Sequence, residues 1–413
     1  MSAALDTRPV TAADQVWTIG APRLLAGLDA QPSLTLATHL AVHGAQPGIE
    51  LDRLVQLLDA AGLSGRGGAG FPLAAKIRSL QGGRPRVIVN GSESEPASFK
   101  DRTLLRRTPH LVLDGALAVA AALNAREVII AVHDPAAFDS VRRAIGERAD
   151  SRSVRVARTD GRFIGGEARA LVRVVDGGPG VPPGRREHPT ATGTLVSNAE
   201  TFAQTAILLR RGSRGFAETG TRVEPGTVLL TIGGAVGHPG VVEAPLGTPL
   251  GILLTAAQAA PATAVVAGGY HGSWVLPHPD IRVSRAGLAA AGASLGAGVL
   301  YVVDDATCAL GELARVTAWL AGESAKQCGP CRFGLPALAA DVAALAAGHP
   351  AALSTAFGHA RAVDGRGACS HPDGAVRFVS SGLHTLQDEV DAHLHGGCGR
   401  PVLGRLPVTG GHR

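Results

Sequence analysis

Two groups of residues in this 413-residue chain have types and spacing that could do chemistry. The first is the glycine nest, residues 62–70, in which five of nine residues are glycine. Each glycine would weaken a helix or strand by roughly 0.5–1 kcal/mol relative to alanine, so such a run is kept mainly where bare backbone approaches a ligand. Phosphate is the usual ligand, because backbone N–H groups fanned out by glycines attract anions, as does a helix that begins just after them.

The flanks of the nest favour a phosphate cradle. Arg66 and Lys76 supply two cations, the stretch 51–63 is apolar at helical spacing, and Pro72 stands where a second helix would begin. The pattern therefore predicts a helix, the glycine nest and another helix. The alternative is a flexible loop or a tight turn that packs against a neighbouring segment.

The second group consists of cysteines. Cys328 and Cys331 have C-x-x-C spacing, and Cys369 offers a third thiol. A zinc site would need a fourth ligand, for which His371 or Cys398 could serve, whereas an iron–sulfur cluster is held by thiolates. A thioredoxin-like pair would require a neighbouring βαβ unit, which this pattern lacks. The residues alone leave zinc and iron–sulfur open.

The elements that must position these groups follow a β-α-β rhythm. A short apolar strand over 86–90 runs directly into a polar segment that contains Glu93 and Glu95. Ligands of open α/β sheets bind beyond the carboxyl ends of strands, so we expect Asn90, Glu93 and Glu95 to face the same crevice as the nest. The expected helices are 111–125 and 136–147, and the expected strands are 127–133 and 154–157. This alternation predicts a doubly wound α/β structure.

Two more helix starts lie near polar groups. Gly165, Gly166 and Glu167 begin a helix that could point N–H groups at a ligand, although an ordinary helix start has the same residues. In Ser197-Asn198-Ala199-Glu200 the Ser-x-x-Glu spacing predicts a capping box made by Ser197, which leaves Asn198 available for another role. The chain then changes to short β segments from 226 and to an alanine- and leucine-rich helical pattern from 306.

Composition excludes several classes of protein. Hydrophobic residues make up 45% and charged residues 18%, so we expect an ordered chain. The net charge of +5 is small and its arginines are scattered, so no nucleic acid is expected as a partner. The N-terminus has no secretory pattern, and no apolar stretch reaches about 18 residues. We therefore expect a cytoplasmic protein with no direct membrane span, peripheral to a membrane only through a partner, and with no disulfide framework among its five cysteines.

Taken in order, the motifs resemble one family, the NADH-binding flavoprotein subunit of respiratory complex I (NADH:quinone oxidoreductase), with relatives in NAD-linked hydrogenases and formate dehydrogenases. The motifs are G-R-G-G-A-G-F-P (65–72), N-G-S-E-S-E-P-A-S-F-K-D-R (90–102), G-G-E-A-R-A-L (165–171), S-N-A-E-T (197–201), a β-grasp-like module, and E-S-A-K-Q-C-G-P-C-R (323–332) with Cys369. The resemblance covers about residues 50–400 and makes this chain a divergent member.

The resemblance implies an α/β fold with a Rossmann-like FMN-binding domain, a small β-grasp-like module and a C-terminal helical iron–sulfur domain. The expected segments are an N-terminal extension (1–50), the FMN-binding domain (51–225), the β-grasp-like module (226–290), the helical iron–sulfur-binding domain (291–400) and a frayed tail (401–413).

The same resemblance implies a function as an oxidoreductase subunit. Electrons would pass from a donor, NADH in the family, through FMN to a 4Fe–4S cluster and on to a ferredoxin-like or membrane-bound redox partner subunit. By this resemblance the FMN phosphate and ribityl chain would be held by Gly65, Arg66, Gly67, Gly68 and Lys76, and the flavin would be lined by Asn90, Glu93, Gly166, Glu167 and Asn198. The nucleotide would contact Phe71 and Glu95, and the cluster ligands would be Cys328, Cys331 and Cys369.

The chain departs from the family pattern at both ends of this path. Ala325 replaces the first cluster cysteine, so that Cys308, Cys398, His371 or water would have to complete the cluster, unless it is a three-iron or labile cluster or absent. In the acidic pattern on the flavin side, Ser92 replaces a carboxylate. Ala168 replaces the second glutamate of a helix start, and V-P-P-G (181–184) replaces K-P-P-F, the loop that embraces the nucleotide in the family. Losing an aromatic stacker and a cation affects the nucleotide site more than the flavin site, so the expectation of NADH binding is weaker than that of FMN binding.

Two alternatives belong to other classes of protein. One is a non-catalytic paralogue that acts as a scaffold or assembly component. The other is a zinc-stabilised binding protein that uses the three cysteines and a histidine.

Overall fold

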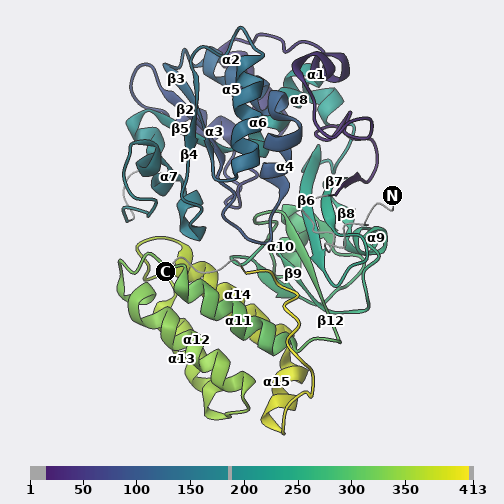
Figure 1. Cartoon of the computed structure of the whole chain (residues 1–413), viewed down its shortest axis with the longest axis vertical. Coiled ribbons are helices and arrows are strands. Elements are labelled where there is room, and N and C mark those ends of the chain that lie inside the picture. The colour runs from purple at the N-terminus through teal and green to yellow at the C-terminus, as the bar shows by residue number, and fades with distance from the viewer. Residues whose placement is uncertain (1–14, 185–187, 409–413) are drawn as a thin grey trace, which may run out of the picture.

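The computed structural model describes residues 15–184 and 188–408, which form three parts. Figure 1 shows an α/β unit, a mixed sheet beside it and a helical C-terminal region below both. The expected fold class, α/β with a helical C-terminal region, is confirmed. No helix within the described ranges is long and apolar enough to cross a membrane.

The α/β unit is built on a parallel four-stranded sheet of order β4-β3-β2-β5. Its strands are β2 (Arg86–Gly91), β3 (Glu127–Val132), β4 (Val154–Arg158) and β5 (Thr194–Asn198). Its helices are α1 (Leu36–His43), α2 (Leu51–Ala60), α3 (Leu73–Arg78), α4 (Lys100–Arg107), α5 (Pro109–Ala122), α6 (Pro135–Gly146), α7 (Ala168–Val175) and α8 (Ala199–Phe216), with 3-10 turns η1 (Phe163–Gly166) and η2 (Pro189–Thr192).

Alternation along β2 explains why helices cover both faces of this sheet. Val87 and Val89 pack into the core shared with α2, α5, α6 and α8, whereas Ile88 packs on the opposite face against Leu171 of α7. A strand that is buried on both faces reads as a continuous apolar run, which is what the sequence pattern showed.

The second sheet is mixed, with the order β1-β7-β6-β12-β9-β10. Its strands are β1 (Val16–Thr18), β6 (Thr227–Gly234), β7 (Gly240–Pro245), β9 (Ala262–Ala267), β10 (Ser273–Val275) and β12 (Val299–Asp304), and beside it lie β8 (Thr248–Pro249), β11 (Arg282–Val283), α9 (Leu250–Ala256) and α10 (Arg285–Ala290). The sheet takes in β1 and β12, which lie outside the expected segment 226–290, because strand pairing joins residues that are distant in the sequence.

The helical region comprises α11 (Ala309–Gly322), a π turn η3 (Pro330–Gly334), α12 (Leu335–Ala346), α13 (Ala351–Val363), α14 (His371–Thr385) and α15 (Gln387–Leu394). The expectation of a frayed tail is wrong for residues 401–408; residues 409–413 lie outside the described ranges. Leu406 is fully buried, Arg405 pairs with Asp304 at 2.7 Å, and the Tyr270 hydroxyl donates to the Pro407 carbonyl at 2.5 Å. Prolines and glycines remove regular structure, but they do not prevent packing.

One charge lies inside the apolar helix α5. Asp114 is 3% exposed and bonds to His39 at 2.7 Å, to Arg148 at 2.7 Å and to Arg210 at 2.5 Å. Burial alone would raise the pKa of this carboxyl, but His39, Arg210 and Arg148 together hold it well below its usual range. Asp114 therefore ties α1, α5, α8 and the segment after α6 together.

We predict that Asp114→Asn destabilises the protein by about 3–5 kcal/mol at pH 7, because it leaves buried cations without their counter-charge. Since folding depresses the pKa of Asp114, its contribution is present above the unfolded value of about 4 and is lost as the pH falls through the folded value. The penalty should therefore shrink below about pH 4. Urea unfolding at several pH values measures it.

Asp59→Asn is the matched control, because Asp59 pairs with Arg78 on the surface and its side chain is 46% exposed. This change should cost at most about 1 kcal/mol. Equal penalties for the two variants would contradict the structural role given to Asp114.

Candidate functional site

The glycine nest connects α2 and α3 as a closed loop. The Gly65 N–H donates to the Phe71 carbonyl at 3.1 Å, and Ser64 bridges Pro72. Two of its glycines lie close to other parts of the protein, and Gly70 also has φ +67°, a conformation that favours glycine. A Cβ on Gly70 would lie 1.8 Å from the Arg285 guanidinium, and a Cβ on Gly67 would lie 3.2 Å from Cβ of Asn198. The nest is therefore a packed turn. The N–H groups of Gly65 and Arg66 bond to the Phe71 carbonyl and the Thr201 hydroxyl, so the N–H groups of residues 67–70 are the part open to a ligand.

The two cations of the nest have different environments. The Arg66 guanidinium is buried and donates to the Thr227 carbonyl at 3.2 Å, with Glu200 at 3.8 Å, so it joins the nest to β6. The Lys76 ammonium donates only to the Val196 carbonyl, at 3.0 Å, and burial lowers its pKa. Within 15–184 and 188–408 no carboxylate forms an ion pair with it. Lys76 is thus a half-buried cation that an anion would stabilise.

The ends of β2 and β5 meet beside the nest. Asn90 lies opposite Asn198 in the sheet register, and its side-chain amide donates to the Gly166 carbonyl at 2.8 Å. Together with the contact between Gly67 and Asn198, this places four separate sequence motifs at one end of the parallel sheet. The structure therefore brings together the segments expected to line a flavin, while the contact that each residue makes with a cofactor stays a prediction.

The two glutamates expected at the flavin use their carboxylates elsewhere. Glu93 accepts from the N–H groups of Asp101 and Arg102, both at 2.8 Å, and so caps α4. Glu167 accepts from the N–H groups of Arg169 and Ala170 and so caps α7. Both carboxylates therefore accept hydrogen bonds from the first N–H groups of a helix. This leaves the backbone of Glu93 and Glu167 for contact with a ligand.

The capping box predicted for Ser197 is wrong. Asn198 is the N-cap of α8, because its Oδ1 accepts from the Glu200 N–H at 3.0 Å, and the Ser197 hydroxyl has no hydrogen bond. Strand β5 runs on through Asn198 and moves the start of the helix by one residue.

Sequence reasoning also gave no role to Lys100 and Asp101, which both bond to Asn198 at 3.1 and 2.5 Å. Lys100 pairs further with Glu200 at 3.0 Å. Their adjacent charges in the motif F-K-D-R were the signal that could have identified them.

The residues expected at the nucleotide differ in exposure. Phe71 is 52% exposed and offers its ring to a ligand. Glu95 is 9% exposed and accepts from the Tyr270 N–H at 2.8 Å, and burial raises the pKa of its carboxyl to about 7. Glu95 therefore titrates near neutral pH at the boundary with the second sheet.

Cys328, Cys331 and Cys369 lie together in the helical region. Burial and the neighbouring thiols Cys328 and Cys369 raise the pKa of Cys331 to about 12. Burial also raises the pKa of Cys369. A bound cation would offset this cost for the thiolates, which are the ligands of iron–sulfur clusters. Ala325 contributes no donor atom. Lys326 beside it has φ +53°, a conformation that favours glycine.

The protein ligands considered as a fourth for this site are not available. His371 donates from Nε2 to the Leu320 carbonyl at 2.9 Å, so its Nδ1 accepts from His271 at 3.0 Å and both nitrogens are occupied. Cys308 is the N-cap of α11. The carbonyl of Cys331 accepts a hydrogen bond from the Ser324 hydroxyl, and Ser324 lies just beyond the C-terminal end of the same helix. The length of α11 separates these ends by roughly 20 Å, and Cys398 lies beside Cys308. Of the alternatives left open for the fourth ligand, His371, Cys308 and Cys398 are therefore not placed to complete the cluster.

Comparisons with known proteins agree with this arrangement. Residues 58–206 match the Nuo51 FMN-binding domain, and residues 311–393 match the NADH-ubiquinone oxidoreductase-F iron-sulfur binding region. The F subunit of NADH-quinone oxidoreductase in Streptomyces coelicolor is 31% identical over 92% of each chain, and that of Rhodobacter capsulatus is 28% identical over 83% of this chain and 88% of the relative.

A crystal structure of an NAD+-reducing [NiFe]-hydrogenase in the air-oxidized state has a TM-score of 0.81 at 26% identity, covering 92% of this chain and 68% of that chain. The sequence match to relatives over nearly their full length, and the shared fold, lead to one assignment. This chain belongs to the family formed by the F subunits of NADH-quinone oxidoreductases.

Proposed function

We propose that this chain is an electron-transfer flavoprotein subunit that passes electrons from a donor through FMN to an iron–sulfur cluster and a redox partner. When bound, a flavin accepts an electron pair and releases single electrons, which connects a hydride donor to a one-electron cluster. Family membership supports this proposal over the scaffold and over the zinc-stabilised binding protein. The observation that best supports it is Lys76, a half-buried cation beside the nest that has no ion-pair partner among the described residues.

In this proposal the FMN phosphate binds at the N–H groups of the nest and at Lys76. Because α3 is only six residues long, its dipole adds little, and the N–H groups and the ammonium supply the attraction. Arg66 holds the nest in place by donating a hydrogen bond to the Thr227 carbonyl of β6. The proposed flavin-lining set is Asn90, Glu93, Gly166, Glu167 and Asn198, with the two glutamates acting mainly through the backbone that they hold in position.

For the donor, the exposed ring of Phe71 supplies a stacking surface, and Glu95 supplies a carboxyl that gains or loses a proton near pH 7. Ala168 and the segment 181–184 lack the groups that the family uses at the nucleotide. Family membership favours NADH as the donor. Because these groups are missing, we expect this chain to make fewer contacts with NADH than its relatives do and to bind it more weakly.

For the cluster, we infer that Cys328, Cys331 and Cys369 are its protein ligands and that the iron near Ala325 has no thiolate. The partner would be a ferredoxin-like or membrane-bound redox subunit, and any membrane association would be peripheral and through it. On this proposal the segments 51–225, 226–290 and 291–400 divide into flavin binding, a connecting β module and cluster binding, with 1–50 as an extension and 401–413 as a tail.

We predict that Lys76→Met weakens FMN binding by about 10- to 150-fold, because a hydrogen bond to a charged group contributes about 1.5–3 kcal/mol. Titration of the flavin-free protein with FMN, followed by flavin fluorescence, measures the dissociation constant.

Arg78→Met on the same helix is the control, since Arg78 is exposed and pairs with Asp59. It should leave FMN affinity unchanged. A Lys76→Met protein that binds FMN within twofold of the unmodified chain would contradict the proposed phosphate site.

We predict that Ala325→Cys raises the iron and sulfide content of anaerobically purified protein and slows its loss in air, because it supplies the missing thiolate. Ala325→Ser is the matched control and should change neither. Iron content and oxygen sensitivity that are equal in the unmodified, Ala325→Cys and Ala325→Ser proteins would argue against a three-cysteine cluster at this place.

A further inference from the structure

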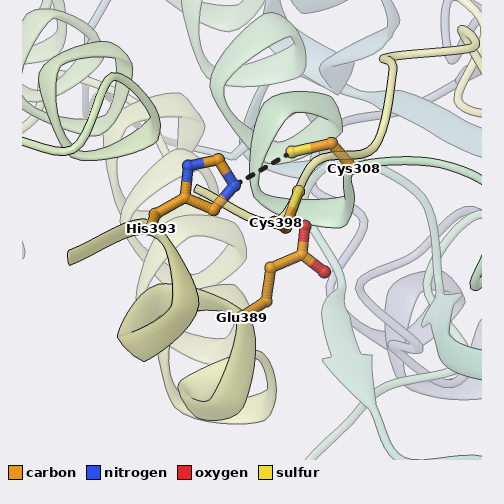
Figure 2. Close-up of side chains that lie close together, drawn as sticks. All are labelled: Cys308, Glu389, His393 and Cys398. Atoms are coloured by element: carbon orange, nitrogen blue, oxygen red, sulfur yellow. Dashed lines mark hydrogen bonds between the residues drawn. The ribbon is translucent and has the colours of Figure 1, made fainter. Parts of the chain in front are cut away.

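A second group of potential metal ligands lies at the other end of α11 from the proposed cluster. Cys308, Glu389, His393 and Cys398 each offer one donor atom, and these atoms all lie within 4.8 Å of one another (Figure 2). Sγ of Cys308 is 3.3 Å from Nε2 of His393. Two sulfurs, one imidazole nitrogen and one carboxylate oxygen are donors that zinc accepts.

The backbone brings these residues together from three elements. Glu389 and His393 are four residues apart on α15 and so share one face of that helix. Cys308 is the N-cap of α11. Cys398 comes back to them because Gly396 and Gly397 have φ of +119° and +100°, which glycine alone adopts readily, and because the Gly397 N–H closes the turn on Ala392.

The hydrogen bond at the far side of His393 fixes its tautomer. Nδ1 lies 2.7 Å from the Ala346 carbonyl. A carbonyl oxygen can only accept, so Nδ1 carries the hydrogen and Nε2 presents a lone pair to the sulfurs. Metal-binding histidines are oriented in this way, with the second nitrogen bonded to a carbonyl or carboxylate.

Hydrogen bonds also hold two of the other ligand side chains in position. Sγ of Cys308 accepts the Gly311 N–H at 3.2 Å, and Oε1 of Glu389 accepts the Leu310 N–H at 3.1 Å. Glu389 is 4% exposed, yet its Oε2 has no hydrogen bond. Arg400 is its nearest cation, 3.4 Å away. Two thiolates, one carboxylate, Arg400 and a divalent ion sum to zero charge, so a metal would balance the group.

We propose that Cys308, Glu389, His393 and Cys398 form a closed structural site for a zinc-like divalent metal ion. Bond lengths of about 2.0–2.3 Å place tetrahedral ligands about 3.3–3.8 Å apart, so donor atoms that lie within 4.8 Å of one another need to approach by at most about 1.5 Å. Four protein donors leave no open position, which is typical of structural and not of catalytic zinc. The site is separate from the proposed cluster cysteines and does not depend on the proposed function.

The site would hold the C-terminal segment against the rest of the chain. Beyond Cys398, the Pro401 carbonyl accepts the Cys308 N–H at 2.8 Å, and Arg405 and Pro407 extend the contact to Asp304 and Tyr270. A metal that joins Cys398 to α11 and α15 would therefore anchor this segment at its start.

The test is metal analysis of the full chain, purified anaerobically, together with Co²⁺ substitution. We expect about one tightly held zinc per chain, as four protein ligands require. Because the cluster cysteines could also take up zinc, the count is repeated in Cys328→Ser/Cys331→Ser, where it should stay the same. Co²⁺ should give sulfur-to-metal charge-transfer bands and the intense visible bands of tetrahedral coordination, and this readout needs no variant.

Cys398→Ser and His393→Gln should each weaken zinc binding by at least about 100-fold, since changes to outer-shell partners alone cost about 10- to 100-fold. His384→Gln, an exposed histidine on the neighbouring helix α14, is the control and should bind zinc unchanged. Three results would each overturn the proposal: zinc retained in both ligand variants, an octahedral cobalt spectrum that marks adventitious binding only, or a Cys308–Cys398 disulfide in the anaerobic protein.

Discussion

The hydrogen bonds of Asn198 are the interaction on which the proposed flavin site depends. Asn198 ends β5, caps α8 and bonds to the charged pair Lys100 and Asp101 at the start of α4, while Gly67 of the nest packs directly on it. One side chain thus fixes the nest, two strand ends and two helices relative to each other. A buried amide with these partners leaves little freedom, so the site is preformed by the fold.

The charged groups that are buried or half-buried fall into two sets: those with a compensating partner inside the protein and those without one. Asp114, Lys100 and Arg66 are buried with opposite charges or hydrogen bonds that compensate them. Lys76 and the thiols around Cys331 lack such compensation within the described chain, and each suits a group from outside, a phosphate or an iron–sulfur cluster. The Cys308 group is a third place that suits a group from outside, because the Glu389 oxygen that faces Arg400 has no hydrogen bond and four donor atoms lie together.

Local sequence patterns predicted the helices, strands and turns that are determined by residues close together in the sequence. The strand over 86–90 and a helix close to the expected range 111–125 follow from apolar runs, and the turn between two helices at the glycine nest follows from its glycines and Pro72. The cap of α8 was missed because the length of β5 decides it. Other features depend on contacts between residues that are distant in the sequence, which spacing alone does not reveal. They are the pairing of β1 with β7, the pairing of β12 with β6, the packed segment around Leu406 and the ligand group around His393.

The most direct test of the central claim is the cofactor content and visible spectrum of the full chain, purified anaerobically without added cofactor. We expect a coloured protein that contains FMN, iron and sulfide and whose flavin absorbance bleaches on chemical reduction. A colourless preparation without flavin and iron, which also fails to take up either cofactor on reconstitution, would contradict it.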